Sequence, residues 1–167
     1  EERPLHIFVN RTHYATILCY PTSLKELAVG HLLSEGVLKS STEIHEISIE
    51  KRGKCQVELK SGVDLQERIK YSQSFGRFIP TTCGSSDHWP LAKLIDRIGL
   101  PKLKLGFRVE AKVVSESTKR LNVVAEVFRR TGGVHVAALC SADGSLIAFA
   151  EDVGRHNAVD KAIGFHT

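Results

Sequence analysis

Several features that would identify a class of protein are missing from this 167-residue sequence. No apolar run reaches the roughly 18 residues that a membrane-spanning helix needs. The first residues are charged and then strand-like, so no signal peptide is expected. Methionine is absent, even at the first position, so we expect a processed or trimmed chain. The net charge of +4 is too small to indicate nucleic-acid binding. We therefore expect a cytoplasmic protein that binds neither nucleic acid nor membrane.

The usual signatures of metal and nucleotide sites are missing as well. The four cysteines are widely spaced and form no CxxC or CxxH pair, so neither a disulfide scaffold nor a structural zinc site is expected. Zinc deaminases carry an H-x-E motif, whereas alanine stands two residues after His135, and there is no P-C-x-x-C. The fingerprints GxGxxG and GxxxxGK[ST] are also absent. The sequence therefore predicts no zinc and no standard nucleotide fingerprint.

What the sequence does have is the composition of a soluble globular domain, with 42% hydrophobic and 25% charged residues. Its length is sufficient for a single domain with a core of its own. Alternating apolar residues predict three hairpins, and helical spacing with cap and stop residues predicts four helices. The strands are expected at 5–10 and 14–20, 43–50 and 55–60, and 135–141 and 145–150, and the helices after Ser23, at 91–98, at 119–129 and after Asn157. Because strands and helices alternate, the predicted fold class is α/β, a mixed β-sheet flanked by helices.

Some of these boundaries depend on single residues. Ser23 and Glu26 form the capping-box pattern S-x-x-E, and Asn157 with Asp160 forms a weaker version of it. Residues 106–114 have the pattern of a strand, and the last hairpin is expected to turn at Asp143-Gly144. Residues 63–70 fit either a helix or an exposed strand.

Three parts are expected within the single domain of residues 1–167. Residues 1–70 hold the N-terminal strands and a helix, and residues 91–167 form the core α/β part with the ligand motifs. Between them, the stretch 72–90 is the longest irregular segment and is rich in serine, threonine, glycine and proline. Loops of this length are usually functional or mobile, so we expect a mobile loop here.

Seven consecutive residues, EDVGRHN at 151–157, place two acids, an arginine, a histidine and an asparagine between a predicted strand and a predicted helix. Ligands of open α/β sheets bind at the carboxyl ends of strands, where a helix N-terminus attracts anions. Arg155 would add a two-pronged contact to a phosphate or carboxylate, and Gly154 would let the backbone approach closely. The alternative is structural, with Arg155 paired to a neighbouring acid and His156 capping a carbonyl.

A second motif, RTGGVH, places Thr131, Gly132 and Gly133 directly before a strand that carries His135. Paired glycines adopt conformations that expose N–H groups toward a ligand. The alternative is a tight turn followed by a core histidine with a satisfied hydrogen bond. A ligand site and a structural turn therefore both fit this motif.

The third candidate is a thiol, Cys83, in the loop sequence PTTCGSS at 80–86. A thiol near a helix N-terminus in a basic environment has a lowered pKa, and its thiolate is the reactive species. Cys19 and Cys140 lie in apolar strand-like runs and are predicted to be inert packing residues. Cys55, at the start of a strand, is a weaker candidate for a reactive thiol. The alternative for Cys83 is an incidental loop thiol.

Together these motifs resemble the FdhD family, the formate dehydrogenase accessory sulfurtransferases. The matching segments, in the family's order, are ERPLHIFVN, ELAVGHLLSEGVL, the Cys-Gly pair of the loop, TGGVHVAAL and EDVGRHNAVDKAIG. The resemblance covers the sequence from Glu2 to Gly164. It implies a fold similar to that of cytidine deaminases, a mixed sheet flanked by helices, without their zinc.

The resemblance implies that the protein carries sulfur. Such proteins accept persulfide sulfur from a cysteine desulfurase on a loop cysteine, here Cys83. They pass it to the molybdenum bis-molybdopterin guanine dinucleotide cofactor that formate dehydrogenase needs. We interpret the two polar motifs as the site for the phosphates or guanine end of this bound substrate, for which GDP would be a mimic. The residues concerned are Thr131, Gly132, Gly133, His135, Gly154, Arg155, His156 and Asn157. Glu151 and Asp152 are expected to orient Arg155 and His156.

Two departures from the family pattern matter. The family commonly has C-G-x-C-G, whereas this sequence has Cys83-Gly84-Ser85-Ser86, so Cys83 alone would hold the persulfide. The family's chains also continue beyond the last motif, whereas this sequence ends at Thr167. We therefore expect a sheet that is incomplete at its C-terminus, with an unpaired edge that favours a homodimer. The expected partners are a cysteine desulfurase and the catalytic subunit of formate dehydrogenase.

Two other functions stay open. In the first, the protein binds a molybdopterin cofactor or a guanine nucleotide as a non-catalytic chaperone. In the second, more distant one, it is a metal-dependent hydrolase built from His13, His135, His156 and an acid. Whether the protein is an enzyme depends on whether Cys83 carries a persulfide.

Overall fold

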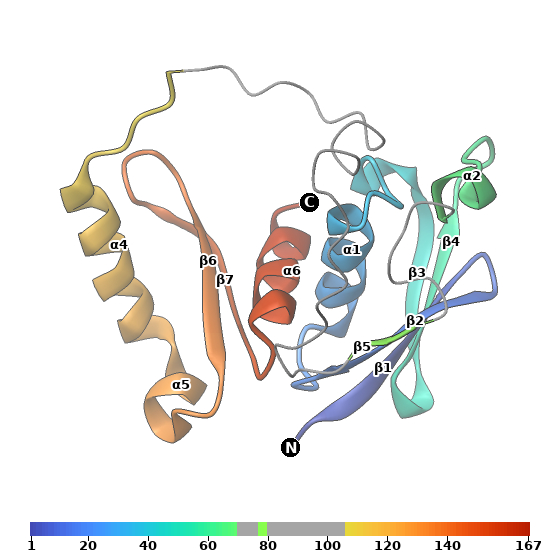
Figure 1. The fold of residues 1–167 in the computed structure, drawn as a ribbon, viewed down its shortest axis with the longest axis horizontal. Helices are drawn as coiled ribbons and strands as arrows, with labels where there is room; N and C mark the ends of the chain where they lie inside the picture. The colour runs from blue at the N-terminus through green and yellow to red at the C-terminus, as the bar shows by residue number, and fades with distance from the viewer. Residues whose placement is uncertain (70–76, 80–105) are drawn as a thin grey trace.

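The computed structural model of this chain describes residues 1–69, 77–79 and 106–167, of which 77–79 are described by their backbone. A five-stranded mixed sheet, sheet A, has the strand order β3-β4-β1-β2-β5 (Figure 1). Its strands are β1 (Arg3–Val9), β2 (Thr12–Cys19), β3 (Ile44–Glu50), β4 (Lys54–Leu59) and β5 (Arg77–Ile79). Two antiparallel hairpins, β1–β2 and β3–β4, are joined by the parallel pair β1–β4, and β5 adds in parallel to β2. Both hairpins confirm the prediction from alternating apolar residues.

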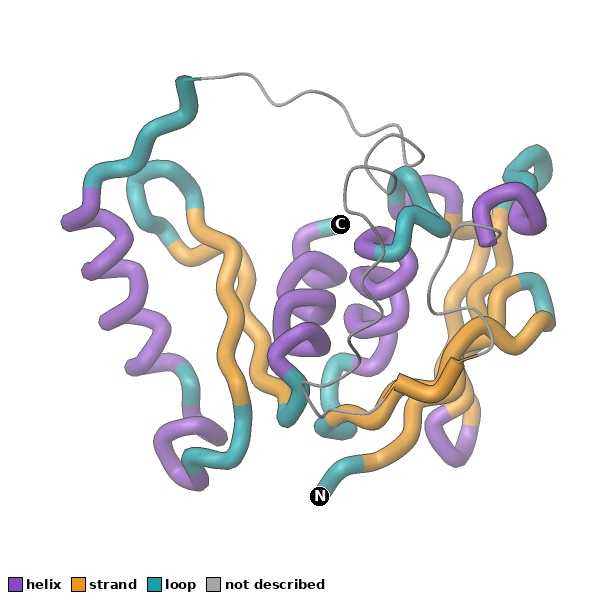
Figure 2. Tube along the Cα trace, viewed as in Figure 1, coloured by secondary structure: helices purple, strands orange, loops and turns teal. Residues whose placement is uncertain are grey.

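A second, two-stranded sheet is the antiparallel hairpin of β6 (His135–Cys140) and β7 (Leu146–Asp152). This hairpin confirms the third predicted pair and its turn at Asp143-Gly144. The helices are α1 (Leu24–Ser34), α2 (Leu65–Ile69), α4 (Ala111–Val124), α5 (Glu126–Thr131) and α6 (Arg155–His166), with short 3-10 turns at Ser41–Glu43 and Lys51–Gly53. Figure 2 shows α1 and α6 between sheet A and the β6–β7 hairpin, with α4 and α5 on the hairpin's far side. The mixed α/β class is therefore confirmed.

The packing of α1 against α6 depends on one glycine in each helix. A Cβ atom at Gly30 would overlap the backbone oxygen of Asp160, and one at Gly164 would overlap the backbone oxygen of Glu26. The two helices run antiparallel, since residue 30 faces 160 and residue 26 faces 164. Each glycine is therefore required by the close approach of the two backbones.

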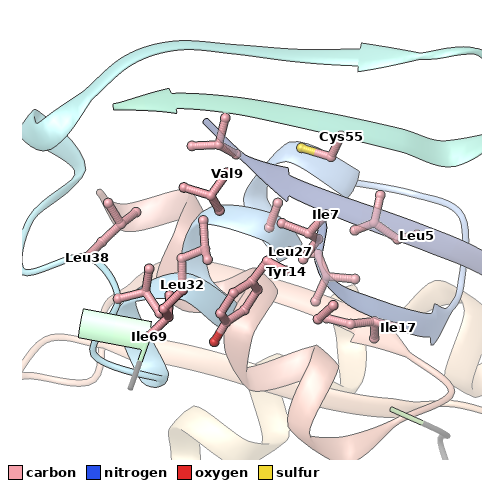
Figure 3. Packing of buried hydrophobic residues seen from close by; sticks show 14 of the residues in the cluster. Leu5, Ile7, Val9, Tyr14, Ile17, Leu27, Leu32, Leu38, Cys55 and Ile69 are labelled. Atoms are coloured by element: carbon pink, nitrogen blue, oxygen red, sulfur yellow. The ribbon is translucent and has the colours of Figure 1, made fainter. Parts of the chain in front are cut away.

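The hydrophobic core lies between sheet A and α1 (Figure 3). A β-bulge between Ile7 and Phe8 of β1 and their partners in β2 leaves Tyr14 without a register partner. Tyr14 and Ala15 are therefore both buried, although they are adjacent in a strand. The fully buried side chains of the core include Leu5, Ile7, Val9, Ile17, Leu27, Leu32, Val37, Cys55 and Val57.

Several expected boundaries are wrong. Ser23 has a φ of 52° and makes no side-chain bond to α1, so the capping box with Glu26 does not form. The first turn closes instead by a bond from the Leu27 amide to the Ser23 carbonyl. Helix α6 begins at Arg155 with Gly154 at its N-cap, so Asn157 is a helical residue and not the cap.

Three segments also differ from their expected secondary structure. Residues 106–114 do not form a strand, because α4 begins at Ala111 after an irregular segment. The helix expected at 119–129 is divided at Ala125 between α4 and α5. Strand β5 lies within the stretch 72–90 that was expected to be irregular, and α2 resolves the ambiguity of 63–70 in favour of a helix.

Other expectations stay predictions. The helix at 91–98 and most of the loop at 72–90 lie outside the described residues. Among the helices that the structure describes, none is both long and apolar enough to cross a membrane. The cytidine-deaminase-like label and the homodimer stay predictions.

Candidate functional site at the start of α6

The two polar motifs meet at one end of the β6–β7 hairpin. In the strand register, His135 lies opposite Asp152, and Val136 lies opposite Glu151. The glycine pair precedes β6, and the Gly154 turn follows β7, so both loops leave the hairpin at the same end. The structure thus brings the two candidate motifs together at one end of the hairpin.

The exposed members of these motifs are Thr131, Gly132, Gly133, His135, Arg155 and His156. Because His135 is exposed, the alternative of a core histidine is wrong. The Arg155 guanidinium forms no ion pair or hydrogen bond with any other described residue, so the alternative of a pair with Glu151 or Asp152 is also wrong. Within the part of the chain that the structure describes, the side chains of Arg155 and His156 are thus exposed at the first turn of α6.

The glycine pair is less available than the sequence suggested. Gly132 ends α5 with a φ of 61°, and its N–H donates to the carbonyl of Phe128 at 2.7 Å. The N–H of Gly133 donates to the hydroxyl of Thr131 at 3.1 Å, and that hydroxyl donates to the carbonyl of Val127 at 2.7 Å. Both amides are thus occupied within the turn, contrary to the expectation that they face a ligand.

Asp152 is fully buried beside the start of α6 and accepts four hydrogen bonds. Its Oδ1 accepts from the Gly154 amide at 2.9 Å and from the Asn157 side chain at 3.0 Å. Its Oδ2 accepts from the Tyr20 amide at 3.0 Å and forms an ion pair with Lys161 at 2.6 Å. The carboxylate therefore has no oxygen left to orient Arg155 or His156, and that expectation is wrong.

Lys161 is also fully buried, and its ammonium group uses all three donors. Besides Asp152, Nζ donates to the carbonyl of Tyr20 at 2.9 Å and to the carbonyl of Glu151 at 3.3 Å. A buried charge is tolerated only when it is paired and hydrogen-bonded, and this one satisfies both conditions. Sequence analysis missed Lys161, although it follows Asn157 by four residues on the face that carries Ala158 and Ala162.

The other two acids of the long motif are also structural. The Glu151 carboxylate accepts from the amides of Val127 and Phe128 at 3.1 and 2.7 Å, so it caps the start of α5. Asp160 accepts from Ser34 at 2.7 Å and lies 3.1 Å from Nδ1 of His31 on α1. Asp160 therefore links α6 to α1 and caps nothing.

The cysteines divide by burial. Cys83 lies outside the described residues. Cys19 and Cys55 are fully buried, and burial raises the pKa of each thiol to about 12. The burial of Cys19 agrees with the prediction that this thiol is inert. The weaker prediction of a reactive thiol at Cys55 is wrong. Cys140 is exposed and not a packing residue.

The described residues do not support a metal site. Among them, no three histidine, cysteine, aspartate or glutamate side chains lie close enough together to hold an ion. His13 lies in β2 and shares the hydroxyl of Thr16 with His6, each at 3.0 Å. The hydrolase alternative is therefore not supported by the part of the chain that the structure describes.

A cavity of about 500 Å³ lies next to the candidate site. Its wall includes Tyr20, Phe149, Glu151 and Phe165 but not Arg155. The cavity is thus a neighbour of the exposed turn, and the Arg155 side chain does not line it.

Comparisons with known proteins place the chain in one family. The model of the FdhD/NarQ family matches residues 1–167. A protein of Staphylococcus haemolyticus named "Sulfur carrier protein FdhD" is 36% identical over 167 residues, which cover 98% of this chain and 60% of the relative. A Staphylococcus aureus protein of the same name is 35% identical over 168 residues with the same coverage. The chain thus spans about 60% of the length of these curated relatives.

A solved structure supports the fold. The chain matches a protein of Desulfotalea psychrophila, described as a formate dehydrogenase accessory protein, with a TM-score of 0.66 and 23% identity. The match covers 98% of this chain and 58% of that one. At this identity the likeness shows the fold alone, whereas the family match rests on sequence over the whole chain. The chain therefore belongs to the FdhD/NarQ family.

Proposed function

We propose that this protein is a sulfur carrier that serves formate dehydrogenase. It would accept sulfur from a cysteine desulfurase on Cys83 and pass it to the molybdenum bis-molybdopterin guanine dinucleotide cofactor, its bound substrate. The names of the curated relatives support the carrier role. The first turn of α6, with the exposed Arg155 and His156, would hold an anionic part of that substrate.

The position of β5 is the observation that carries this proposal. β5 runs parallel to β2, and Ile79 at its end pairs with Ile17. The next residue of β2, Leu18, accepts a hydrogen bond from the side chain of Asn157 in the first turn of α6. Cys83 comes four residues after Ile79, a covalent tether of about 14 Å when extended. This tether begins at the edge of sheet A where β2 meets the proposed anion site.

The first turn of α6 has the chemistry that a phosphate requires. The first intrahelical bond of α6 runs from the Ala158 amide to the Gly154 carbonyl, so the amides of residues 155–157 precede it. These amides carry the positive end of the helix dipole. Arg155 adds a guanidinium with no partner among the described residues. Phosphate oxygens would therefore meet both backbone and side-chain donors.

The transfer step on the protein is a thiol–persulfide exchange. The Cys83 thiolate attacks the outer sulfur of the desulfurase persulfide, the S–S bond of that persulfide breaks, and the desulfurase cysteine leaves as a thiolate. Cys83 then carries the outer sulfur as its own persulfide, with no net oxidation or reduction. His135 and His156, both exposed at the site, would help to position the bound substrate through hydrogen bonds from their rings.

Mass spectrometry after incubation with a cysteine desulfurase and cysteine tests the proposal. We expect a one-sulfur mass increase on the Cys83 peptide, reversed by dithiothreitol, in the wild type and in Cys140→Ala. Cys140 is the matched control because its thiol is exposed. Cys83→Ala should lose both the adduct and the activation of formate dehydrogenase while keeping its melting temperature. If that variant still activates the enzyme, the carrier role is wrong. If GDP binds but no adduct forms, a non-catalytic chaperone is the better description.

A further inference from the structure

The buried pair of Asp152 and Lys161 lies directly beneath the exposed turn that carries Arg155. Both side chains are fully buried, and neither can contact a ligand in solution. All three Nζ donors of Lys161 and both carboxylate oxygens of Asp152 are occupied by protein groups. Because every donor and acceptor of this pair is used, the hydrogen bonds restrict the positions of the groups around the pair as well as stabilising it.

These bonds hold the turn from two sides. Asp152 fixes the amide of Gly154, the residue directly before α6, and the side chain of Asn157 in the first turn. Asn157 also donates to the carbonyl of Leu18 at 2.8 Å, and Lys161 donates to the carbonyl of Tyr20 at 2.9 Å. The start of α6 is therefore fastened to the end of β2 by bonds between residues more than a hundred positions apart in sequence.

Gly154 is part of the same arrangement. A Cβ atom at this position would lie 2.9 Å from Nδ2 of Asn157, which is closer than a real Cβ contact. The φ of Gly154 is −97°, so its backbone does not require glycine. The absence of a side chain at Gly154 thus makes room for the Asn157 amide.

We propose that Asp152, Asn157 and Lys161 are positioning residues that hold the first turn of α6 in register with the end of β2, so that its amides and Arg155 face an anion without rearrangement. The inference rests on the proposed anion-binding role of that turn. Buried ion pairs seldom add net stability compared with apolar residues, but they can specify a geometry. A site that is already ordered avoids the free-energy cost of ordering when its ligand binds.

The direction in which one substitution changes the affinity for an anion distinguishes a positioning role from a purely electrostatic effect. Asp152→Asn removes a negative charge close to the proposed anion site, so Coulomb's law alone predicts tighter binding of pyrophosphate. Positioning predicts the opposite, because the amide side chain cannot accept all four hydrogen bonds. We expect calorimetric titration to show pyrophosphate affinity about tenfold weaker than in the wild type. Unchanged or tighter binding in a folded Asp152→Asn variant would overturn the proposal.

A second variant covers the case in which Asp152→Asn does not fold. Asn157→Ala changes no charge and removes the bonds to Leu18 and Asp152. We expect weaker pyrophosphate binding and faster hydrogen exchange at the amide of Gly154, with the rest of the protection pattern retained. The matched control is Asn122→Ala on the exposed face of α4, which should change neither measurement.

Hydrogen exchange also separates this inference from the proposed function. If the wild type does not bind pyrophosphate, the proposal of an anion site is wrong. Hydrogen exchange at the Gly154 amide then decides by itself whether Asp152, Asn157 and Lys161 order the turn. If Gly154 exchanges at the wild-type rate in folded Asn157→Ala, the positioning role is wrong, whatever the affinity.

Discussion

The ammonium group of Lys161 lies 2.6 Å from Oδ2 of Asp152, and both side chains are completely buried. One partner belongs to α6 and the other to β7, and both also bond to the backbone of Tyr20. Through this pair, a two-stranded hairpin and a helix near the C-terminus are joined to the N-terminal sheet. The proposed anion site lies on the solvent side of this junction.

Removal of one partner of this pair should strongly destabilise the protein. Lys161→Met keeps most of the aliphatic volume but leaves the Asp152 carboxylate buried without its counter-charge. We expect a loss of about 3–5 kcal/mol in the free energy of unfolding, measured by urea denaturation. Lys119→Met, at an exposed position of α4, is the control and should change stability by less than about 0.5 kcal/mol. A loss below about 1 kcal/mol for Lys161→Met would show that the pair does not hold the junction.

The contact between α1 and α6 should not tolerate a methyl group. Gly30→Ala would place a Cβ against the backbone oxygen of Asp160, which cannot move independently of its helix. Overpacking of this kind costs about 1–3 kcal/mol or more. The control is Gly133→Ala, where a Cβ would have its nearest neighbour at 3.6 Å. Equal melting temperatures for the two variants would contradict the described helix packing.

Acid should selectively weaken the attachment of α2. Arg68 donates to both carboxylate oxygens of Glu43, at 2.6 and 2.8 Å, and also to the carbonyl of Val37. The hydrogen bonds from Arg68 lower the pKa of Glu43 to about 2. An acid whose folded pKa is depressed stabilises the protein above its unfolded pKa of about 4.3, and this contribution disappears as the pH falls through its folded value.

The stability difference between the wild type and Glu43→Gln should therefore shrink between about pH 5 and pH 2. Urea denaturation at several pH values measures this difference. Glu46→Gln, at an exposed position of β3, is the control for general acid effects. A difference that stays constant over this range would show that Glu43 is not held by Arg68.

Thiol reactivity should separate the cysteines by their burial. Cys19 and Cys55 are buried, and the raised pKa of each thiol, about 12, leaves almost no thiolate at pH 8. Iodoacetamide followed by mass spectrometry should therefore label Cys140 in the folded protein, and all the cysteines in urea. Labelling of Cys55 as fast as Cys140 in the folded protein would contradict the described core.

Features of this fold that depend on local sequence pattern could be predicted, and features that depend on distant partners could not. The hairpins follow from alternating apolar residues and from the Asp143-Gly144 turn, so they could be predicted. The roles within EDVGRHNAVDK could not, because the partners of these residues lie far away in sequence. Asp160 was interpreted as a cap because its true partner, His31, is 129 positions earlier. The start of helix α4 was missed because residues 106–114 alternate between apolar and polar like a strand, although the apolar residues of the whole helix follow a helical period.

The family motif therefore divides into two groups of residues that sequence alone does not separate. Asp152, Asn157, Asp160 and Lys161 are buried and form the frame, whereas Arg155 and His156 are exposed. One signal for the buried group was available, since Asn157 and Lys161 lie on the same helix face as two alanines. Their identity as parts of one network required the position of β2.

The most direct test of the account is affinity labelling with a GDP analogue that carries a thiol-reactive haloacetyl group at its terminal phosphate. If the first turn of α6 holds the phosphates within reach of the carrier thiol, the analogue labels Cys83 in preference to the exposed Cys140. GDP should suppress this preference, and Arg155→Gln should abolish it. Labelling of Cys83 and Cys140 at equal rates, unaffected by GDP or by Arg155→Gln, would contradict the claim that thiol and anion site act together.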